Sequence, residues 1–371
     1  MMSYNPLTDM LQKTEEELRN MPPVNMMLVG NTGAGKSTLI NAVFREELAT
    51  TGQGLPVTKH LRRIEKPGIP LVLYDTRGLE LSAEALMGVT EEVLGVIEEK
   101  AIDPKEAIHI LWYCINAGNN RIEEYEIEML RKFSEKIPVI LVLTQCIGEP
   151  TMEFAEMLKR MNLPVAGVAT LLAKAYPIGT GITVPPWGLQ ELVRMSYDLL
   201  PEDASYSFIN AQQVDIEKKA AVARRWAKGY IATTCGVGFV PVPFSDAAVL
   251  VPMQISMLAH ITAIFGISMS KATITSLVAS IGGTGGATML GRYIVSNALK
   301  FIPGAGTVLG GLISGATAGV LTTALAMSYI ELLTIISKRE ADGKTMPGEE
   351  MSSIMKDLYI KYLELSKKKK T

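Results

Sequence analysis

The chain has 371 residues, a length typical of two or three domains. Lysine and arginine total 36, and aspartate and glutamate total 38, so the net charge is −2. This balance argues against a protein that coats nucleic acid, and no nucleic-acid partner is expected. An apolar fraction of 48% and a charged fraction of 20% exclude wholesale disorder. The three scattered cysteines and three isolated histidines argue against a disulfide scaffold or a zinc cluster, so a reduced intracellular protein is expected.

Residues 1–23 predict an N-terminal amphipathic helix rather than a signal peptide. No basic start precedes an apolar run, and two prolines at 22 and 23 end the helical pattern. The apolar stripe consists of Leu7, Met10, Leu11 and Leu18.

The segment 24–203 alternates strand and helix patterns, as a doubly wound α/β fold requires. Several strand patterns are apolar without alternation, which is typical of a mostly parallel sheet covered by helices on both faces. The expected strands are 24–30, 60–66, 69–75, 107–115, 138–144 and a last one near 165–172. One helix is expected directly after Lys36, and further helices are expected to span about 82–100, 121–136, 151–161 and 188–200.

A glycine-rich loop between the first strand and the first helix carries the strongest motif. Its sequence, GNTGAGKS from Gly30 to Ser37, matches G-x-x-x-x-G-K-[ST]. Main-chain N–H groups of such a loop wrap a phosphate, and the helix N-terminus adds a partial positive charge. Lys36 is expected to reach the β- and γ-phosphates, and Ser37 is expected to bind Mg²⁺. The expected phosphate-binding residues are Asn31, Thr32, Gly33, Ala34, Gly35, Lys36, Ser37 and Thr38.

A second magnesium element follows the strand 69–75. The sequence from Asp75 to Gly78 is DTRG, in which Asp75 is expected to hold Mg²⁺ through water and the Gly78 N–H to contact the γ-phosphate. Thr58, just before strand 60–66, is expected to reach both the metal and the γ-phosphate and to order its loop. The alternative is that Thr58 is a surface residue of a mobile loop. The expected metal ligands are therefore Ser37, Thr58 and Asp75, and the expected catalytic groups are Lys36, Thr58 and Gly78.

The order GNTGAGKST, PVT, DTRG and a strand ending LTQ resembles the Era-like, translation-factor-class GTPases over about residues 24–200. The resemblance implies that GTP is hydrolysed to GDP and phosphate with Mg²⁺. It assigns the switch threonine to Thr58 and the switch aspartate and glycine to Asp75 and Gly78. The chain from about 204 onward resembles the hydrophobic C-terminal domain of unknown function of many bacterial GTPases, most clearly in PVPFSDAAVLVPMQISMLAHITAIFG.

Two features depart from the family pattern. Where the family reads guanine with [NT]-K-x-D, this chain has Thr144, Gln145, Cys146 and Ile147, so the base-reading carboxylate is absent. Relaxed guanine specificity, adenine as the base, and Glu149 as a substitute acid stay open. The last base-contacting loop is expected at LLAKAYPIG, with Ala173 and Lys174 near the base.

The second departure is Leu79, which follows D-x-x-G where many small GTPases carry a glutamine that orients water. We therefore expect slow intrinsic hydrolysis that rises on self-assembly or partner binding.

Charge is nearly absent from a long stretch of the second half. Between Gly229 and Ile330, 102 residues, the sequence holds 15 of the 32 glycines. The charged residues there are only Asp246, Lys271, Arg292 and Lys300. This shift marks a domain boundary, placed near 201–228, where one charged amphipathic helix is expected. We expect an apolar helical domain over 204–371, with helices near 246–265, 303–330 and 346–365.

The uncharged runs 247–270, 272–291 and 301–330 are long enough for two or three membrane spans. Gly311, Gly315 and Gly319 recur at every fourth position, which permits close helix packing. The alternatives are an integral helical hairpin and a compact bundle that docks on lipid or a partner. The lysines at 367–370 either add contact with anionic lipid or form a solvated tail. The expected location is a cytoplasmic GTPase domain that is membrane-associated through residues 229–330.

Two classes of function follow from these patterns. The first is a slow, assembly- or partner-stimulated GTPase switch, with membrane lipid and a second copy of the chain as further partners. The second is a nucleotide-gated binding or membrane structural module with little turnover. Leu79 and the missing base-reading aspartate favour the second class. A complete magnesium set of Ser37, Thr58 and Asp75 favours the first.

Overall fold

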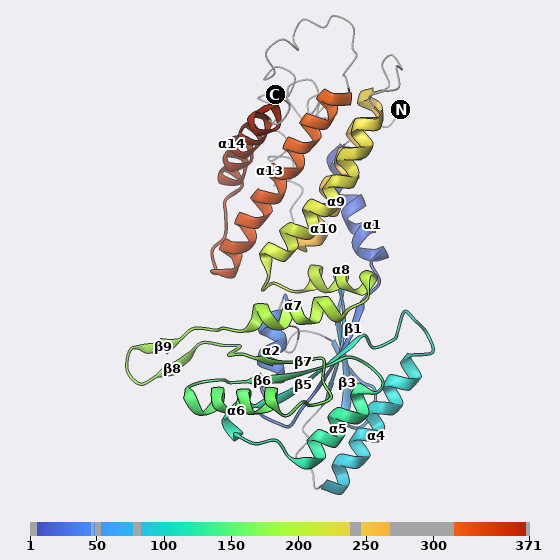
Figure 1. The fold of residues 1–371 in the computed structure, drawn as a ribbon. Helices are drawn as coiled ribbons and strands as arrows, with labels where there is room; N and C mark the ends of the chain where they lie inside the picture. Colours follow the sequence, from blue (N-terminus) through green and yellow to red (C-terminus); the bar gives the residue numbers. More distant parts are fainter. Residues whose placement is uncertain are drawn as a thin grey trace, which may run out of the picture. The chain divides into compact units, whose positions relative to one another are not determined.

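The computed structural model describes residues 6–45, 48, 53–76, 83–237, 246–267 and 315–368 (Figure 1). The chain divides into two compact units. The sheet unit comprises residues 21–215, and the helical unit comprises residues 1–20 and 216–371. The N-terminal helix therefore belongs to the helical unit, and the division falls after residue 215, inside the range 201–228 in which the composition shift places the boundary.

The sheet unit is built on seven strands in the order β2-β3-β4-β1-β5-β6-β7. β4, β1, β5, β6 and β7 are parallel, and β2 and β3 are added antiparallel at one edge. The strands are β1 (Val24–Val29), β2 (Gln53–Pro56), β3 (Leu61–Lys66), β4 (Ile69–Thr76), β5 (Ile110–Asn116), β6 (Val139–Thr144) and β7 (Gly167–Thr170). The expected doubly wound, mostly parallel sheet is confirmed. Its chain order reverses beside β1, and ligands of such sheets bind at that point, outside the carboxyl ends of the strands.

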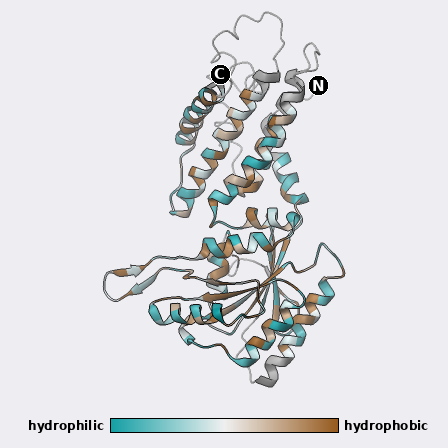
Figure 2. Ribbon diagram, in the orientation of Figure 1, coloured by the Kyte–Doolittle hydropathy of each residue, from teal (hydrophilic) through white to brown (hydrophobic). Residues whose placement is uncertain are grey.

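Both faces of the sheet are covered by helices. Along β1, Met26 and Leu28 lie in one apolar core, and Met27 and Val29 lie in the other, because successive strand residues point to opposite faces. The inner parallel strands β1, β5 and β6 are accordingly apolar along most of their length (Figure 2). The first core is closed by α2 (Lys36–Val43), α7 (Leu189–Leu199) and α8 (Glu202–Ala211), and the second by α4 (Ala83–Lys100), α5 (Glu124–Ser134) and α6 (Glu149–Arg160).

An aromatic cluster ties α8 to the sheet unit. Phe44 stacks on Trp112 at 5.8 Å between ring centroids and meets Phe208 of α8 edge-on at 6.0 Å. The chain then breaks at Gln212, whose backbone is extended. The Gln212 Oε1 accepts hydrogen bonds from the main-chain N–H groups of Val214 and Asp215, both at 2.7 Å. The single helix expected over 201–228 is therefore wrong, because this side-chain turn separates α8 from α9 (Ile216–Val237).

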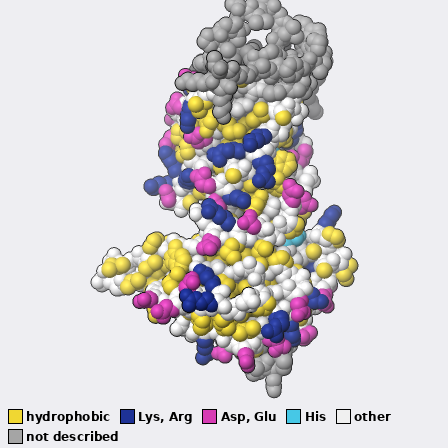
Figure 3. All heavy atoms as spheres, viewed as in Figure 1, with side chains coloured by type: hydrophobic (Ala, Val, Ile, Leu, Met, Phe, Trp, Pro, Cys, Tyr) yellow, Lys and Arg dark blue, Asp and Glu magenta, His cyan; other side chains and the backbone are white. Residues whose placement is uncertain are grey.

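The sequence patterns did not predict the edge strand β2 or a short hairpin outside the main sheet. β8 (Tyr176–Ile178) and β9 (Ile182–Val184) pair with each other outside the main sheet. Their side chains include Tyr176, Ile178 and Ile182, which are 49%, 46% and 65% exposed. Hydrophobic side chains accordingly gather on the surface of this arm (Figure 3). Strands of three residues without a buried face carry no periodic signal.

The described part of the helical unit consists of α1 (Pro6–Asn20), α9, α10 (Asp246–Phe265), α13 (Gly315–Ala341) and α14 (Gly348–Lys368). α13 packs on α9 and α14, and α10 packs on α1 and α9. Several buried polar groups inside the bundle are paired with one another. The Gln254 Nε2 donates to the Thr322 Oγ1 at 3.1 Å, Thr262 and Tyr329 share a hydrogen bond of 2.7 Å, and the Lys219 Nζ donates to the Phe265 carbonyl at 2.7 Å.

Within the described residues, one helical segment, Gly319–Ala341, is long and apolar enough to cross a membrane. Seventy-two per cent of its apolar window is buried inside the protein, as in a core helix. The described part of the expected helix over 303–330 lies in α13, and residues 303–314, with the charged positions Lys271, Arg292 and Lys300, lie outside the described residues.

Candidate functional site

The glycine-rich loop lies at the carboxyl end of β1, where close packing dictates glycine at two positions. A Cβ on Gly30 would lie 2.3 Å from the carbonyl oxygen of Cys114 on β5. Gly35 has φ 80°, a left-handed conformation, and directly precedes α2. A Cβ there would lie 3.2 Å from the Thr144 Oγ1. These close approaches pack the phosphate loop against β5 and β6. They also fix the N-terminus of α2 at the carboxyl ends of these strands.

The Lys36 side chain is buried and folds back over this loop. Its ammonium donates to the carbonyl oxygens of Gly30 at 2.6 Å and Asn31 at 3.2 Å. Burial lowers the pKa of Lys36, and the nearby Asp75 carboxylate opposes that shift. Because an ammonium has three donors, one N–H is left over after these two contacts. A cation held in this way suits an anionic ligand such as a phosphate chain.

Asp75 lies one residue before the end of β4, the strand next to β1, and is buried with 3% of its surface exposed. Its Oδ2 accepts from the Nε and Nη2 of Arg62 at 3.0 and 2.8 Å. Its Oδ1 is buried and has no hydrogen-bond partner in the described part of the chain. A buried carboxylate oxygen without a donor is costly, and a hydrated Mg²⁺ is a natural partner for it. The residues present therefore fit a magnesium site formed by Asp75 and the exposed hydroxyl of Ser37 in the first turn of α2.

The structure does not bring Thr58 to this carboxylate. The Thr58 hydroxyl donates to the Oε1 of Glu92 on α4 and accepts from the main-chain N–H of Leu61 at 3.1 Å. Glu92 also accepts from the His60 main-chain N–H at 3.0 Å and contacts the His60 Nδ1 at 2.8 Å. In this conformation Thr58 is bound to α4, and its metal-binding role stays a prediction. Gly78 and Leu79 lie outside the described residues.

Two of the expected base-reading residues, Thr144 and Gln145, contact the phosphate loop. The Thr144 Oγ1 donates to the Ala34 carbonyl at 2.8 Å. Gln145, with φ 54°, donates from its Nε2 to the Gly33 carbonyl at 3.2 Å. Ile147 and Ala173 are half-buried, while Lys174 and Glu149 are exposed, as is Thr38 on α2. A main-chain hydrogen bond links the segment after β6 to the segment after β7, since the Cys146 N–H donates to the Leu171 carbonyl at 3.1 Å.

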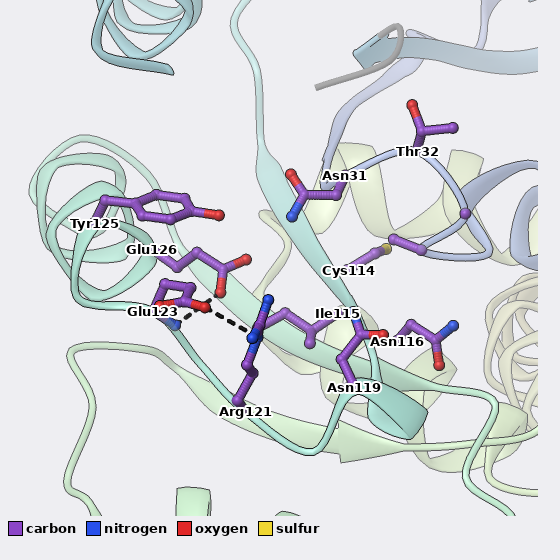
Figure 4. Close-up of a pocket in the computed structure, with 12 residues that line it drawn as sticks. Asn31, Thr32, Cys114, Ile115, Asn116, Asn119, Arg121, Glu123, Tyr125 and Glu126 are labelled. Atoms are coloured by element: carbon purple, nitrogen blue, oxygen red, sulfur yellow. Dashed lines mark hydrogen bonds and ion pairs between the residues drawn. The ribbon is translucent and has the colours of Figure 1, made fainter. Parts of the chain in front are cut away.

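A polar cavity of about 150 Å³ opens between the phosphate loop and the segment that follows β5 (Figure 4). The phosphate-loop part of its lining is Asn31–Ala34, and the Tyr125 hydroxyl points toward the Asn31 amide. Burial raises the pKa of the Glu126 carboxyl, which accepts from the Glu123 N–H at 3.0 Å. Residues that sequence reasoning missed here are Asn116, Asn119, Arg121, Glu123, Tyr125 and Glu126. Their spacing carries no motif, and only the parallel pairing of β1 with β5 brings them to the loop.

Comparisons with known proteins fit this geometry. Residues 25–145 match the family model described as 50S ribosome-binding GTPase, and residues 210–359 match the domain of unknown function DUF697. The chain is 28% identical over 193 residues to the tRNA modification GTPase MnmE of Treponema denticola, covering 47% of this chain and 39% of that protein. It is 24% identical over 183 residues to the GTPase Era of Corynebacterium glutamicum, covering 48% and 55%.

A third relative is Magnetosome membrane protein 22 of Magnetospirillum gryphiswaldense, which is 27% identical over 110 residues, covering 30% of this chain and 56% of that protein. The chain thus spans about half the length, or less, of these curated relatives.

Proposed function

Since this chain belongs to the Era-like P-loop GTPases and carries a DUF697 domain, as its motifs predict, we propose that it hydrolyses GTP slowly and acts as a switch that assembly or a partner stimulates. One observation carries the proposal. A buried lysine with a spare donor and a buried aspartate with an unpaired oxygen lie at the carboxyl ends of adjacent parallel strands, β1 and β4. Such a pairing of charges is suited to a triphosphate with its metal.

The roles of the individual residues follow from charge and position. Main-chain N–H groups of the loop Gly30–Ser37 and the N-terminus of α2 would bind the phosphates, and the Lys36 ammonium would stabilise negative charge on the transferred group. Ser37 and Asp75 would hold Mg²⁺, and Thr58 would join them once released from Glu92. Mg²⁺ supplies charge neutralisation and orientation of the phosphate oxygens when bound.

Slow turnover is proposed because Leu79 stands where many small GTPases carry a glutamine that orients the attacking water. Phosphoryl transfer depends on positioning and charge neutralisation, so a second protein surface can supply the missing group. Guanine preference is proposed to be relaxed, because the half-buried Ile147 stands where the family has its aspartate.

A nucleotide-gated binding module with little turnover is the second candidate. The contact between Thr58 and Glu92 favours it, because a switch threonine fixed to α4 does not complete the metal site.

We further propose association with a membrane or with a second copy of the chain through the helical unit. The segment Gly319–Ala341 and the printed name of the relative Magnetosome membrane protein 22 support the membrane proposal. Extraction of membranes with alkaline carbonate tests it. Retention in the pellet supports a spanning helix, release from a sedimented membrane fraction supports peripheral docking, and absence from membranes at every ionic strength contradicts both.

Single-turnover phosphate release from GTP, measured over a range of protein concentrations, tests the switch. We expect a rate per molecule that rises with concentration in the parent and is abolished in Lys36→Ala. Lys136→Ala is the matched control, because that exposed lysine follows α5 and pairs with Glu98 of α4 rather than with the phosphate loop. A fast rate that is independent of concentration contradicts the stimulated switch, and tight GTP binding without phosphate release supports the binding module.

A further inference from the structure

A basic residue outside every motif contacts the aspartate of the metal site. We propose that Arg62 on β3 is a positioning residue that fixes the Asp75 carboxylate by one oxygen and so keeps the other oxygen available to the cation. The inference rests on the proposed nucleotide site and names a residue that sets its magnesium dependence.

The strand register places the two residues together. Arg62 and Asp75 are direct partners in the antiparallel pairing of β3 with β4, so their side chains share one face of the sheet. The Arg62 side chain is 23% exposed and that of Asp75 is 5% exposed. The contact is therefore largely shielded from water, where a charged hydrogen bond holds its geometry better than at an open surface.

The pattern of hydrogen bonds is asymmetric. An arginine that simply neutralises a carboxylate commonly forms two parallel bonds, one to each oxygen. Here both Nε and Nη2 of Arg62 converge on Oδ2, at 3.0 and 2.8 Å, while Oδ1 is buried without a partner in the described residues. One oxygen is thus occupied by protein, and the other is left for a ligand that the protein does not supply.

The charges around Asp75 support the same assignment. Burial is the main cause of the lowered pKa of Lys36, and the nearby charge of Arg62 lowers it further while that of Asp75 opposes the shift. The two N–H donors of the planar Arg62 guanidinium converge on Oδ2 and so fix the orientation of the Asp75 carboxylate.

Arg63 provides a matched control on the same strand. It is the next residue along β3, so its side chain points to the opposite face, and its Nη1 pairs with the Glu65 Oε1 at 2.6 Å. It has the same charge and a similar exposure of 33%, but no described contact with Asp75.

The test is a Mg²⁺ titration of GTP affinity in the full chain, with a second measurement in excess EDTA. For Arg62→Gln we expect the Mg²⁺ concentration at half-effect to rise by about tenfold or more, the size seen when partners of a metal ligand are removed, with the EDTA affinity unchanged. Arg62→Lys keeps the charge but cannot donate from two nitrogen atoms to Oδ2, so we expect the Mg²⁺ concentration at half-effect to recover in part. Arg63→Gln should match the parent.

The single variant can overturn the inference in two ways while leaving the proposed function intact. One is an unchanged Mg²⁺ dependence in Arg62→Gln, and the other is an equal loss of affinity with and without Mg²⁺, which marks a purely structural pair. Adding Arg62→Gln to Asp75→Asn should cause no further change, and a further change contradicts action through Asp75. If Arg62→Gln does not fold, Arg62→Lys decides by its Mg²⁺ dependence alone. A parent that binds no GTP with Mg²⁺ overturns the proposed function itself.

Discussion

The phosphate loop requires glycine for two reasons, close packing and a positive φ. Alanine substitutions at Gly30 and Gly33 separate these two effects. Gly30→Ala puts a Cβ 2.3 Å from the Cys114 carbonyl oxygen, whereas a Cβ on Gly33 meets nothing within 4 Å. Ordinary contact needs roughly 1 Å more than the first distance, so β1 and β5 must move apart at Val29 and Tyr113, which are register partners.

The magnitudes follow from these distances. Overpacking costs about 1–3 kcal/mol and a strained backbone conformation a similar amount, so Gly30→Ala should destabilise the sheet unit by about 4 kcal/mol. Gly33 has φ 78°, and alanine there should cost only the left-handed penalty of about 1–2 kcal/mol.

Trp112, buried on β5 against Phe44, reports unfolding of this region. We propose urea denaturation of the full chain followed by Trp112 fluorescence, with Trp187 and Trp226 replaced by phenylalanine in every variant. Equal stabilities of Gly30→Ala and Gly33→Ala would refute the close approach of the loop to β5.

Three further outcomes are expected. Glu92→Ala removes the acceptor of the Thr58 and His60 hydrogen bonds, so amide exchange of residues 57–61 should accelerate about 10- to 100-fold, whereas Glu91→Ala, exposed on the same helix, should leave it unchanged; equal protection in both variants contradicts the contact. Ile147→Asp supplies the missing carboxylate and should raise the ratio of GTP to ATP affinity about 10- to 100-fold in a competition assay, with Ile147→Asn as control; an unchanged ratio places the base elsewhere. Burial raises the pKa of the Cys114 thiol to about 12, so the thiolate is scarce at lower pH and iodoacetamide should label Cys114 only in denaturant; rapid native labelling near pH 8 would show that the loop opens.

The sequence predicts the sheet and the centre of its site well, for physical reasons. Fully buried parallel strands are continuous apolar runs, and their helices carry strong periodicity, so elements such as β1, β5 and α4 begin and end within a few residues of expectation. The phosphate loop is local, since its glycines, Lys36 and Ser37 are adjacent in the chain.

Features that depend on contacts between distant segments were not predictable. The hydrogen bonds between Arg62 and Asp75 follow from the antiparallel register of β3 and β4. The hydrogen bond between Thr58 and Glu92 joins residues 34 positions apart. The turn at Gln212 is local, but it depends on side-chain hydrogen bonds that no propensity encodes. Thr58 illustrates the limit most clearly, because its place before β3 was predicted while its partner on α4 was not.

Calorimetric titration of the full chain with GTP and Mg²⁺ tests the central claim most directly, namely that the loop Gly30–Ser37 binds a nucleoside triphosphate. We predict saturable binding to one site in the parent and its loss in Lys36→Ala, while Lys136→Ala binds as the parent does. Absence of binding to the folded parent by any purine triphosphate, or full affinity in Lys36→Ala, would contradict the account.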